Sequence, residues 1–340
     1  MSGRPVRERA GRSVVVSPVV MPGGYPAGHA PIRRGSALGG PGSYGETVHM
    51  TSRHGPPFGV AIALVLLGIG SVQLGAGFAK LLFDDIAPNG VVWLRLATSS
   101  LVLLLWARPR LRGRTRADWM VAARYGACLG AMNWGIYQSF SRIPIGVAVT
   151  IEFIGPLVLA VVGFRRPRDL GWVVLAGLGV LLLGFERGHL DPVGVAYAVL
   201  AGAAWAGYIL SSAATGRRWE GIEGLGVASL VAVVLLTPLL LTVDTADLAD
   251  ERVLLLGAAV GLLSSVIPYS AELAALRTLP AATFGVLMSL EPAAAALAGL
   301  VVVGETLAPV QWLAVGCVVV ASVGATRATR ATVHPDVTPA

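Results

Sequence analysis

Ten long apolar runs, separated by short polar breaks, occupy the chain from residue 58 to residue 325. Most are close to the roughly 20 residues that an α-helix needs to cross the hydrocarbon layer of a membrane. A backbone group left unpaired in lipid costs several kcal/mol, so we expect every run to be helical. The fifth run is short and is expected to extend into its flanks. The predicted spans are 58–82, 88–107, 119–141, 144–164, 170–186, 192–213, 222–243, 253–274, 280–303 and 307–325.

Charged residues make up 13% of the 340 residues, and apolar residues make up 55%. A soluble domain carries about 25% charged residues, so a mostly wetted surface is excluded. The net charge is +7, but the charges cluster between the apolar runs and form no binding face for nucleic acid. The sequence therefore predicts an all-α integral membrane protein without a nucleic-acid partner.

Residues 1–57 differ from the rest of the chain, because they are rich in Gly, Pro, Ser and Arg and have no apolar periodicity. Such a segment cannot bury a core, so we expect a disordered cytoplasmic tail or an extension upstream of the true start. Met50, eight residues before the first apolar run, is a reasonable start.

Lys and Arg are distributed unequally between the two sides of the predicted membrane. Twenty lie in the N-terminal segment, the even-numbered loops and the C-terminal tail, and four lie on the opposite side. Without the N-terminal segment the ratio is still thirteen to four. Because positive charge accumulates on the cytoplasmic side, we expect both termini to be cytoplasmic. The acidic loop after the seventh run is then external.

The second half of the apolar region repeats the first. Pro144 and Pro280 each begin a run, and a second proline follows twelve residues later, at Pro156 and Pro292. The offset of 136 residues also places the first run on the sixth. An odd number of spans per half inverts the second half, and inverted repeats that meet at the bilayer midplane are typical of transporters. We expect two inverted five-helix repeats at 58–186 and 187–326, followed by a cytoplasmic tail at 327–340.

Five charged residues fall inside the predicted spans: Arg95, Arg124, Glu152, Glu272 and Glu291. Insertion scales assign such residues about 2.5–3.5 kcal/mol each at the helix centre, so a functional role is the first hypothesis. The alternatives are a structural ion pair or a side chain that reaches the interface.

Prolines within the spans mark the places where the helices are expected to kink. Proline has no N–H, so it frees the carbonyl four residues before it. Carbonyls are freed in this way at Glu152 by Pro156, at Ser264 by Pro268 and at Met288 by Pro292. Transporters place substrates and ions at such broken helices. The alternative is that these prolines only shape the helices, since proline is common in membrane spans.

Uncharged polar side chains share helical faces with these positions, because Asn133 and Tyr137 are four residues apart and Tyr269 and Glu272 are three apart. Such donors and acceptors suit a zwitterionic or hydroxylated solute. The alternative is hydrogen bonding between helices, worth about 0.6 kcal/mol per bond in membranes. The candidate residues for binding substrate or protons are Gln73, Arg95, Asn133, Tyr137, Glu152, Tyr208, Tyr269, Glu272 and Glu291, with Pro156, Pro268 and Pro292 as kinks.

Several chemistries find no support in the sequence. All five histidines lie outside the spans, and the two cysteines have no metal-binding or disulfide spacing. No GxSxG motif and no P-loop occurs, so hydrolase and ATP-driven activities lose support. We expect no metal and no cofactor, and a gradient as the energy source, most simply protons exchanged at a carboxylate.

The chain resembles the RhtA-type threonine/homoserine exporters, within the EamA branch of the drug/metabolite transporter superfamily. The resemblance covers residues 58–326 and is spread over all ten spans. The stretches that carry it are Ser71-Val72-Gln73, Ala79–Phe83, Leu94-Arg95-Leu96, Gly130–Asn133, Gly146–Val149, Glu152-Phe153, Gly155-Pro156-Leu157, Tyr208–Ser211, Pro268-Tyr269-Ser270, Glu272, Phe284–Ser289, Glu291-Pro292-Ala293 and Gly304–Leu307.

This resemblance implies ten helices in two EamA repeats, in a bacterial inner membrane, and export of small amino acids by proton antiport. Glu152 is then expected to bind alternately a proton and the ammonium group of the substrate. A broader metabolite or drug exporter of the same fold is the alternative, and a homodimer stays open. An enzyme would need a nucleophile–base pair that is not visible, and a receptor or scaffold would leave the paired kinks unexplained.

Overall fold

The computed structural model describes residues 56–162, 170–184, 190–220, 222–275, 278–279 and 281–333. Within these ranges every regular element is a helix and there is no strand, as the sequence predicts. Residues 1–55 of the predicted tail and residues 334–340 of the C-terminal tail lie outside the described residues, so the predictions for them are not addressed.

The first half follows the predicted spans closely, with one interruption. The second predicted span begins and ends at the observed residues, but the fourth consists of two helices that are separated at Phe153. The elements are α1 (Phe58–Leu81), η1 (Leu82–Asp84), α2 (Pro88–Ala107), α3 (Arg116–Phe140), α4 (Ile145–Glu152), α5 (Ile154–Val162) and α6 (Leu170–Gly184).

The second half is more segmented than the sequence predicts. Its eighth and ninth predicted spans contain short π-helical turns, η4 and η5, and the ninth is also broken at Ser289 and Leu290. The elements are α7 (Pro192–Gly216), α8 (Glu223–Leu236), η3 (Thr237–Thr242), α9 (Thr245–Ala249), α10 (Glu251–Gly261), η4 (Leu262–Val266), α11 (Ile267–Ala275), α12 (Ala281–Met288), α13 (Glu291–Ala298), η5 (Gly299–Val303) and α14 (Pro309–Val333).

Among the described residues, six helical runs are long and apolar enough to cross a membrane. They are Phe58–Asp84, Pro88–Ala107, Pro192–Gly216, Glu223–Thr242, Glu251–Glu272 and Thr283–Val303. Large apolar side chains such as Leu101, Leu105 and Leu255 stay more than half exposed on outer helix faces. Soluble proteins rarely expose extended apolar surface, so these faces are suited to contact lipid. The count of ten spans goes beyond these six runs and stays a prediction.

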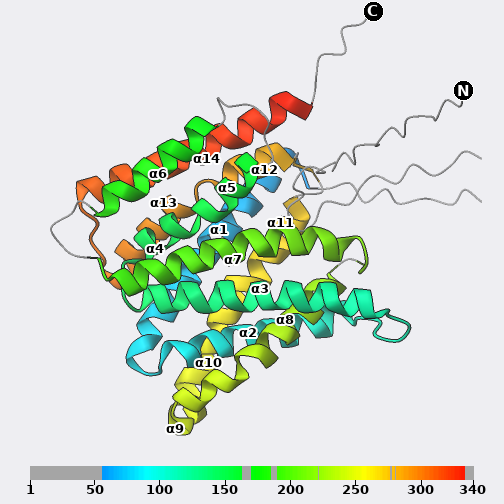
Figure 1. Ribbon diagram of the computed structural model, residues 1–340. Helices are drawn as coiled ribbons and strands as arrows, with labels where there is room; N and C mark the ends of the chain where they lie inside the picture. Colours follow the sequence, from blue (N-terminus) through cyan, green and yellow to red (C-terminus); the bar gives the residue numbers. More distant parts are fainter. Residues whose placement is uncertain are drawn as a thin grey trace, which may run out of the picture.

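The helices run lengthwise through one bundle, with the α6–α14 pair along one side and α2, α8 and α10 along the other (Figure 1). Between these layers α3 packs on α7 and α8, and α1 packs on α11 and α13. The two broken helices meet where α4 packs on α13. A Cβ added to Gly146 would lie 2.7 Å from the Cα of Ala296, so this close crossing requires a glycine.

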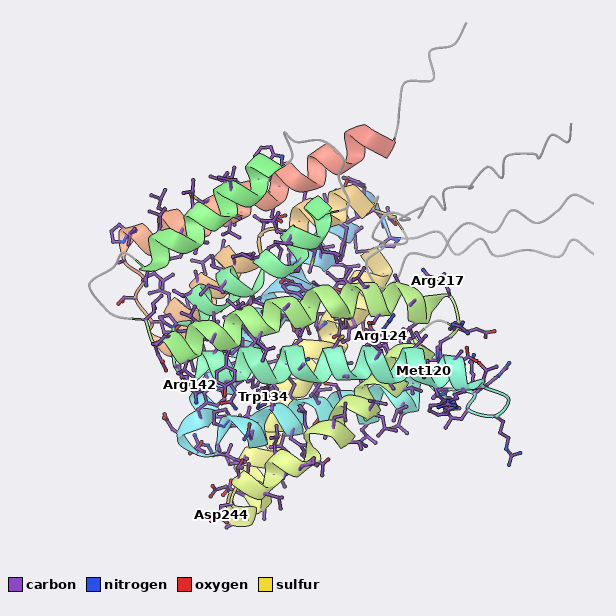
Figure 2. All side chains as sticks on the ribbon, viewed as in Figure 1. Met120, Arg124, Trp134, Arg142, Arg217 and Asp244 are labelled. Atoms are coloured by element: carbon purple, nitrogen blue, oxygen red, sulfur yellow. The ribbon has the colours of Figure 1, made fainter. Side chains whose placement is uncertain are left out.

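The two ends of the bundle are distinct. Figure 2 shows Arg142 and Asp244 at one end of the long helices and Arg217 at the other. We name the first the Lys80 end, because Lys80 donates to the carbonyl of Ile143 there. We name the other the Arg114 end, because Arg114 donates there to the carbonyl of Arg218, the residue after Arg217.

Candidate functional site

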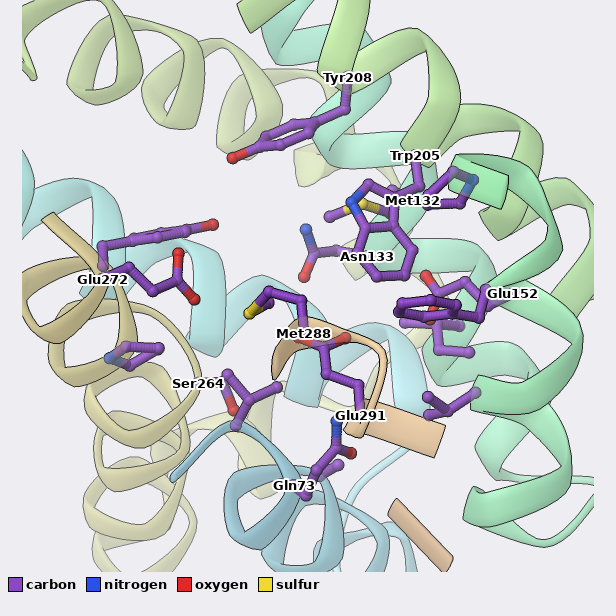
Figure 3. Close-up of a pocket in the computed structure, with 18 of the residues that line it drawn as sticks. Gln73, Met132, Asn133, Glu152, Trp205, Tyr208, Ser264, Glu272, Met288 and Glu291 are labelled. Atoms are coloured by element: carbon purple, nitrogen blue, oxygen red, sulfur yellow. The ribbon is translucent and has the colours of Figure 1, made fainter. Parts of the chain in front are cut away.

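A cavity of about 150 Å³ lies inside the bundle, between the two broken helices and the π-turn η4. It collects most of the polar residues that the sequence singles out, from α1, α2, α3, α7 and the segments around both breaks (Figure 3). Ten of the predicted residues line it: Gln73, Arg95, Asn133, Glu152, Pro156, Tyr208, Pro268, Tyr269, Glu272 and Glu291.

Three carboxylates face this cavity. Glu152 and Glu291 are each only 8% exposed, and Glu272 is half-buried. Among the described residues, none of the three forms an ion pair within 4.0 Å. Glu291 lies close enough for its charge to interact with those of Glu272 and Glu152. Within the described residues these groups do not form a cluster that could hold a metal ion.

Arg95 is the one cation among the described residues that line the cavity. Its Nη2 donates to the carbonyl oxygen of Ser264 at 3.2 Å, while its Nε has no partner. The carbonyl of Ser264 is the one that Pro268 leaves without a helical donor, and the chain forms the π-turn η4 at this point. The carbonyl oxygen of Ser264, which has no helical donor, is therefore free to accept the bond that holds the Arg95 guanidinium. Arg95 also lies close enough to Glu152 for their charges to interact.

Four buried polar atoms of the cavity wall have no hydrogen-bond partner in the part of the chain that the structure describes. They are Gln73 Oε1, Arg95 Nε, Asn133 Oδ1 and Ser264 Oγ. Buried polar groups are nearly always paired, so each unpaired one requires an explanation, such as a ligand that completes the site. The set contains both donors and acceptors, which suits a solute that carries both.

Two of the predicted residues lie outside the cavity wall. Tyr137 is fully buried, and the guanidinium carbon of Arg95 lies 5.3 Å from the centre of its ring, so it lies behind the arginine. Pro292 is buried in the first turn of α13. Arg124, the other arginine predicted inside a span, lies on an exposed face of α3 and does not line the cavity.

Several residues of the cavity wall were not among the predicted site residues. Phe153, Met132 and Met288 line the cavity, and the ring of Phe153 packs edge-on against Trp205 at a centroid distance of 5.4 Å. The sequence singles out Ser264 only for the carbonyl that Pro268 frees, and not as a residue of the site. The two methionines carry no signal in a single sequence, since methionine is common in any apolar core.

The sequence also gives no warning of an ion-pair cluster at the Lys80 end. Lys80 Nζ lies 2.5 Å from Glu305 Oε1 and donates to the carbonyl of Ile143 at 2.9 Å. The other oxygen of Glu305 accepts from the backbone N–H of Ile145 at 2.8 Å. Ile145 begins α4, whose N-terminus has no side-chain cap of its own, so the carboxylate satisfies a free donor and complements the helix dipole. Glu305 thereby joins α1, α4 and the segment that follows η5.

The Arg114 end is joined by different ion pairs. Arg114 Nη2 lies 2.7 Å from Glu223 Oε2, and Arg218 Nη1 lies 2.9 Å from Asp118 Oδ1. Asp118 also accepts hydrogen bonds from Thr115 in the capping box that begins α3. The hydrogen bond from the Thr115 backbone and the bond from Arg218 lower the pKa of Asp118 to about 2.

Several known proteins are similar to this chain in sequence. The model of the EamA-like transporter family matches residues 192–327. The threonine/homoserine exporter RhtA of Escherichia coli (strain K12) is 41% identical over 277 residues, which are 81% of this chain and 94% of that relative. RhtA of Salmonella typhimurium (strain LT2) is 40% identical over the same length, with the same shares covered.

A protein of known crystal structure has the same fold. Its TM-score is 0.55 at 17% identity, and the match covers 79% of this chain and 98% of that protein. The identity to the RhtA proteins, over most of both chains, is high enough to establish common membership. The chain therefore belongs to the EamA-like transporter family, as an RhtA-type multi-pass membrane protein.

Proposed function

We propose that this protein is a secondary transporter and not an enzyme, and that it exports small hydrophilic amino acids such as threonine or homoserine by proton antiport. The observation that carries the proposal is the cavity between the broken helices, where one guanidinium and three carboxylates converge. The names of the RhtA relatives support the same substrate class.

The charges of the cavity suit both ends of a zwitterion. Arg95 has an unpartnered Nε for the substrate carboxylate, and a planar guanidinium is well matched to that group. Glu152, the last residue of α4, provides the acceptor for the ammonium group of the substrate. A substrate bound between them neutralises both charges, which offsets the cost of holding them away from water.

The surplus of carboxylates provides the proton coupling. Three acidic groups and one cation in a buried cavity cannot all be charged at low cost, because like charges at close range disfavour ionisation. Glu152 then holds a proton when the site is empty and releases it when an ammonium group arrives. Entry of protons in one direction thereby drives export of substrate in the other.

The arrangement of the helices supports alternating access. At the Lys80 end α4 packs on α13 and Glu305 ties the two halves together. Towards the Arg114 end α5 and α12 both pack on α14, but α5 also packs on α7 and α6 while α12 packs on α1. We place the Arg114 end in the bacterial cytoplasm, with both termini, and treat the ten spans as two inverted five-helix repeats.

The size of the cavity favours small amino acids over the broader drug-exporter alternative. Pockets for drug-sized ligands usually measure about 300–1,000 Å³. This cavity, at about 150 Å³, is smaller.

The test is transport by purified protein in proteoliposomes, with Glu152→Gln compared with Glu220→Gln. Glu220 is an exposed glutamate outside the cavity and controls for loss of a negative charge. Wild type and Glu220→Gln should exchange labelled threonine and move it against its gradient when a pH gradient is imposed. Glu152→Gln should insert normally but lose the response to the pH gradient. Wild-type protein that exchanges no labelled amino acid would refute the proposed function. A Glu152→Gln variant with unchanged pH dependence would refute the coupling role alone.

A further inference from the structure

We infer that Asn133 recognises the side chain of the substrate, because its Oδ1 accepts a hydrogen bond from a hydroxyl group of that side chain. The site therefore selects hydroxylated amino acids over apolar ones of equal size. This inference rests on the proposed function and adds a selectivity that the charges of the cavity cannot provide, since every amino acid has the same ammonium and carboxylate groups.

The orientation of the Asn133 amide is fixed by its own helix. Its Nδ2 donates to the carbonyl oxygen of Leu129, one turn earlier in α3, at 2.8 Å. A carbonyl oxygen can only accept, so the amide cannot be turned over without losing this bond. The other atom, Oδ1, is consequently held as an acceptor. It has no partner, and the residue is only 2% exposed.

The other amide of the cavity lacks this constraint. Gln73 also has an unpartnered Oε1, but no hydrogen bond among the described residues fixes its side chain. Gln73 can therefore present either its oxygen or its nitrogen to a ligand. Asn133 is therefore the amide of the cavity wall whose oxygen is fixed as an acceptor before a ligand binds.

Only two groups of a hydroxylated amino acid can donate to this oxygen, the ammonium group and the hydroxyl group. The ammonium group is drawn to the carboxylates of the cavity, because hydrogen bonds between charged partners are roughly twice as strong as neutral ones. The substrate carboxylate has no proton to give. The hydroxyl group therefore remains as the partner for the Asn133 oxygen.

The surroundings of Asn133 suit the carbon atoms of such a side chain. Figure 3 shows Asn133 in the wall of the cavity, with Met132, Met288 and Trp205 labelled around it. Methionine side chains adapt to the shape of what they contact. An apolar substrate side chain could fill the same space, but it would leave the Asn133 oxygen buried and unpaired, and sites built in this way reject the analogue that lacks the polar group.

Threonine and valine provide the cleanest comparison, since they differ by a hydroxyl in place of a methyl group. In proteoliposomes, each unlabelled amino acid competes for exchange of labelled threonine, and the ratio of the two inhibitory concentrations is the readout. Wild-type protein should prefer threonine over valine by roughly tenfold or more, the effect of one neutral hydrogen bond. In Asn133→Leu the ratio should fall close to one. A variant that is merely destabilised would lose both affinities together and keep the ratio.

Ser100→Ala is the matched control, because Ser100 is also buried with an unpartnered hydroxyl but does not line the cavity. Its ratio should equal that of wild type. If Asn133→Leu fails to insert into the membrane, the ratio of inhibitory concentrations is measured in Asn133→Ala, where it should also fall close to one. Equal competition by threonine and valine in wild type, or an unchanged ratio in the Asn133 variants, overturns the inference. Absence of any exchange in wild type is a different outcome and counts against the proposed function itself.

Discussion

The break between α4 and α5 lies against backbone, whereas the break between α12 and α13 lies against side chains. At the first break, a Cβ added to Gly202 of α7 would lie 2.6 Å from the carbonyl oxygen of Glu152, and Gly155 faces the backbone of Gly202 directly. At the second break, Phe284 and Met288 belong to an apolar cluster with Val65 and Ile69 of α1.

This difference bears on how the molecule can move. Two backbones in direct contact have no side-chain rotamers to exchange, so the first break is fixed relative to α7. A contact made of side chains can repack, and the unbranched Met288 is well suited to that. We therefore expect the second break to change more during transport, although each break has a carboxylate beside it, Glu152 before the first and Glu291 after the second.

The largest effect is expected at the backbone contact. Gly202→Ala places a methyl group against the Glu152 carbonyl, and overpacking of this kind costs about 1–3 kcal/mol. We expect a lower melting temperature and loss of threonine exchange, measured on purified protein and in proteoliposomes. Gly70→Ala is the control, because a Cβ there meets nothing within 4 Å. That variant should gain about 0.5–1 kcal/mol from the better helix former. Similar melting temperatures for the two variants would show that the first break is not held by its backbone contact.

A smaller effect is expected at the second break. Ser289 Oγ forms a hydrogen bond with Ser322 Oγ of α14 at 2.8 Å and another with the carbonyl of Gly285 at 2.9 Å. Ser289→Ala removes these bonds and should cost about 1 kcal/mol. Exchange of threonine should continue, because the surrounding side chains can repack. Loss of exchange as complete as in Gly202→Ala would remove the contrast between the two breaks.

The smallest effect is expected far from both breaks, at the capping box of α3. The pKa of Asp118 is about 2 in the folded protein, against an ordinary value of 3.8. A lowered pKa contributes stability that is present above the ordinary value and is lost as the pH falls towards the folded value. The melting temperature of Asp118→Asn should therefore lie slightly below that of wild type at neutral pH. The difference should shrink between about pH 4 and pH 2. A difference that does not change with pH would contradict this account.

The sequence predicts the helices well, because apolar length and proline position act locally. The second span and α2 have the same bounds, and the carbonyl that Pro268 frees at Ser264 accepts a bond from Arg95. The breaks themselves fall a few residues before Pro156 and Pro292, at Phe153 and at Ser289 and Leu290. The positions of the two breaks depend on how the helices pack on their neighbours. Local sequence propensity contains no information about that packing.

The parts of the site that escape prediction depend on contacts between distant segments. Helical spacing places Asn133 and Tyr137 on one face, but only the tertiary structure sets Asn133 in the cavity wall and Tyr137 behind Arg95. The pairing of Lys80 with Glu305 joins two segments from opposite halves. No periodicity within one sequence reports such a pair, so only the structure identifies it.

The contact at Lys80 also makes the chain a natural reporter of its own opening. Lys80 is the sole lysine among the 26 basic Lys and Arg residues, so its side chain holds the one primary amine outside the chain terminus. With Nζ held by Glu305 and the carbonyl of Ile143, that amine is engaged while the Lys80 end is closed. On the proposed alternating access, we therefore expect an acylating reagent to modify this side chain only in molecules in which Glu305 has released it. The extent of acylation measures the open fraction without an engineered label.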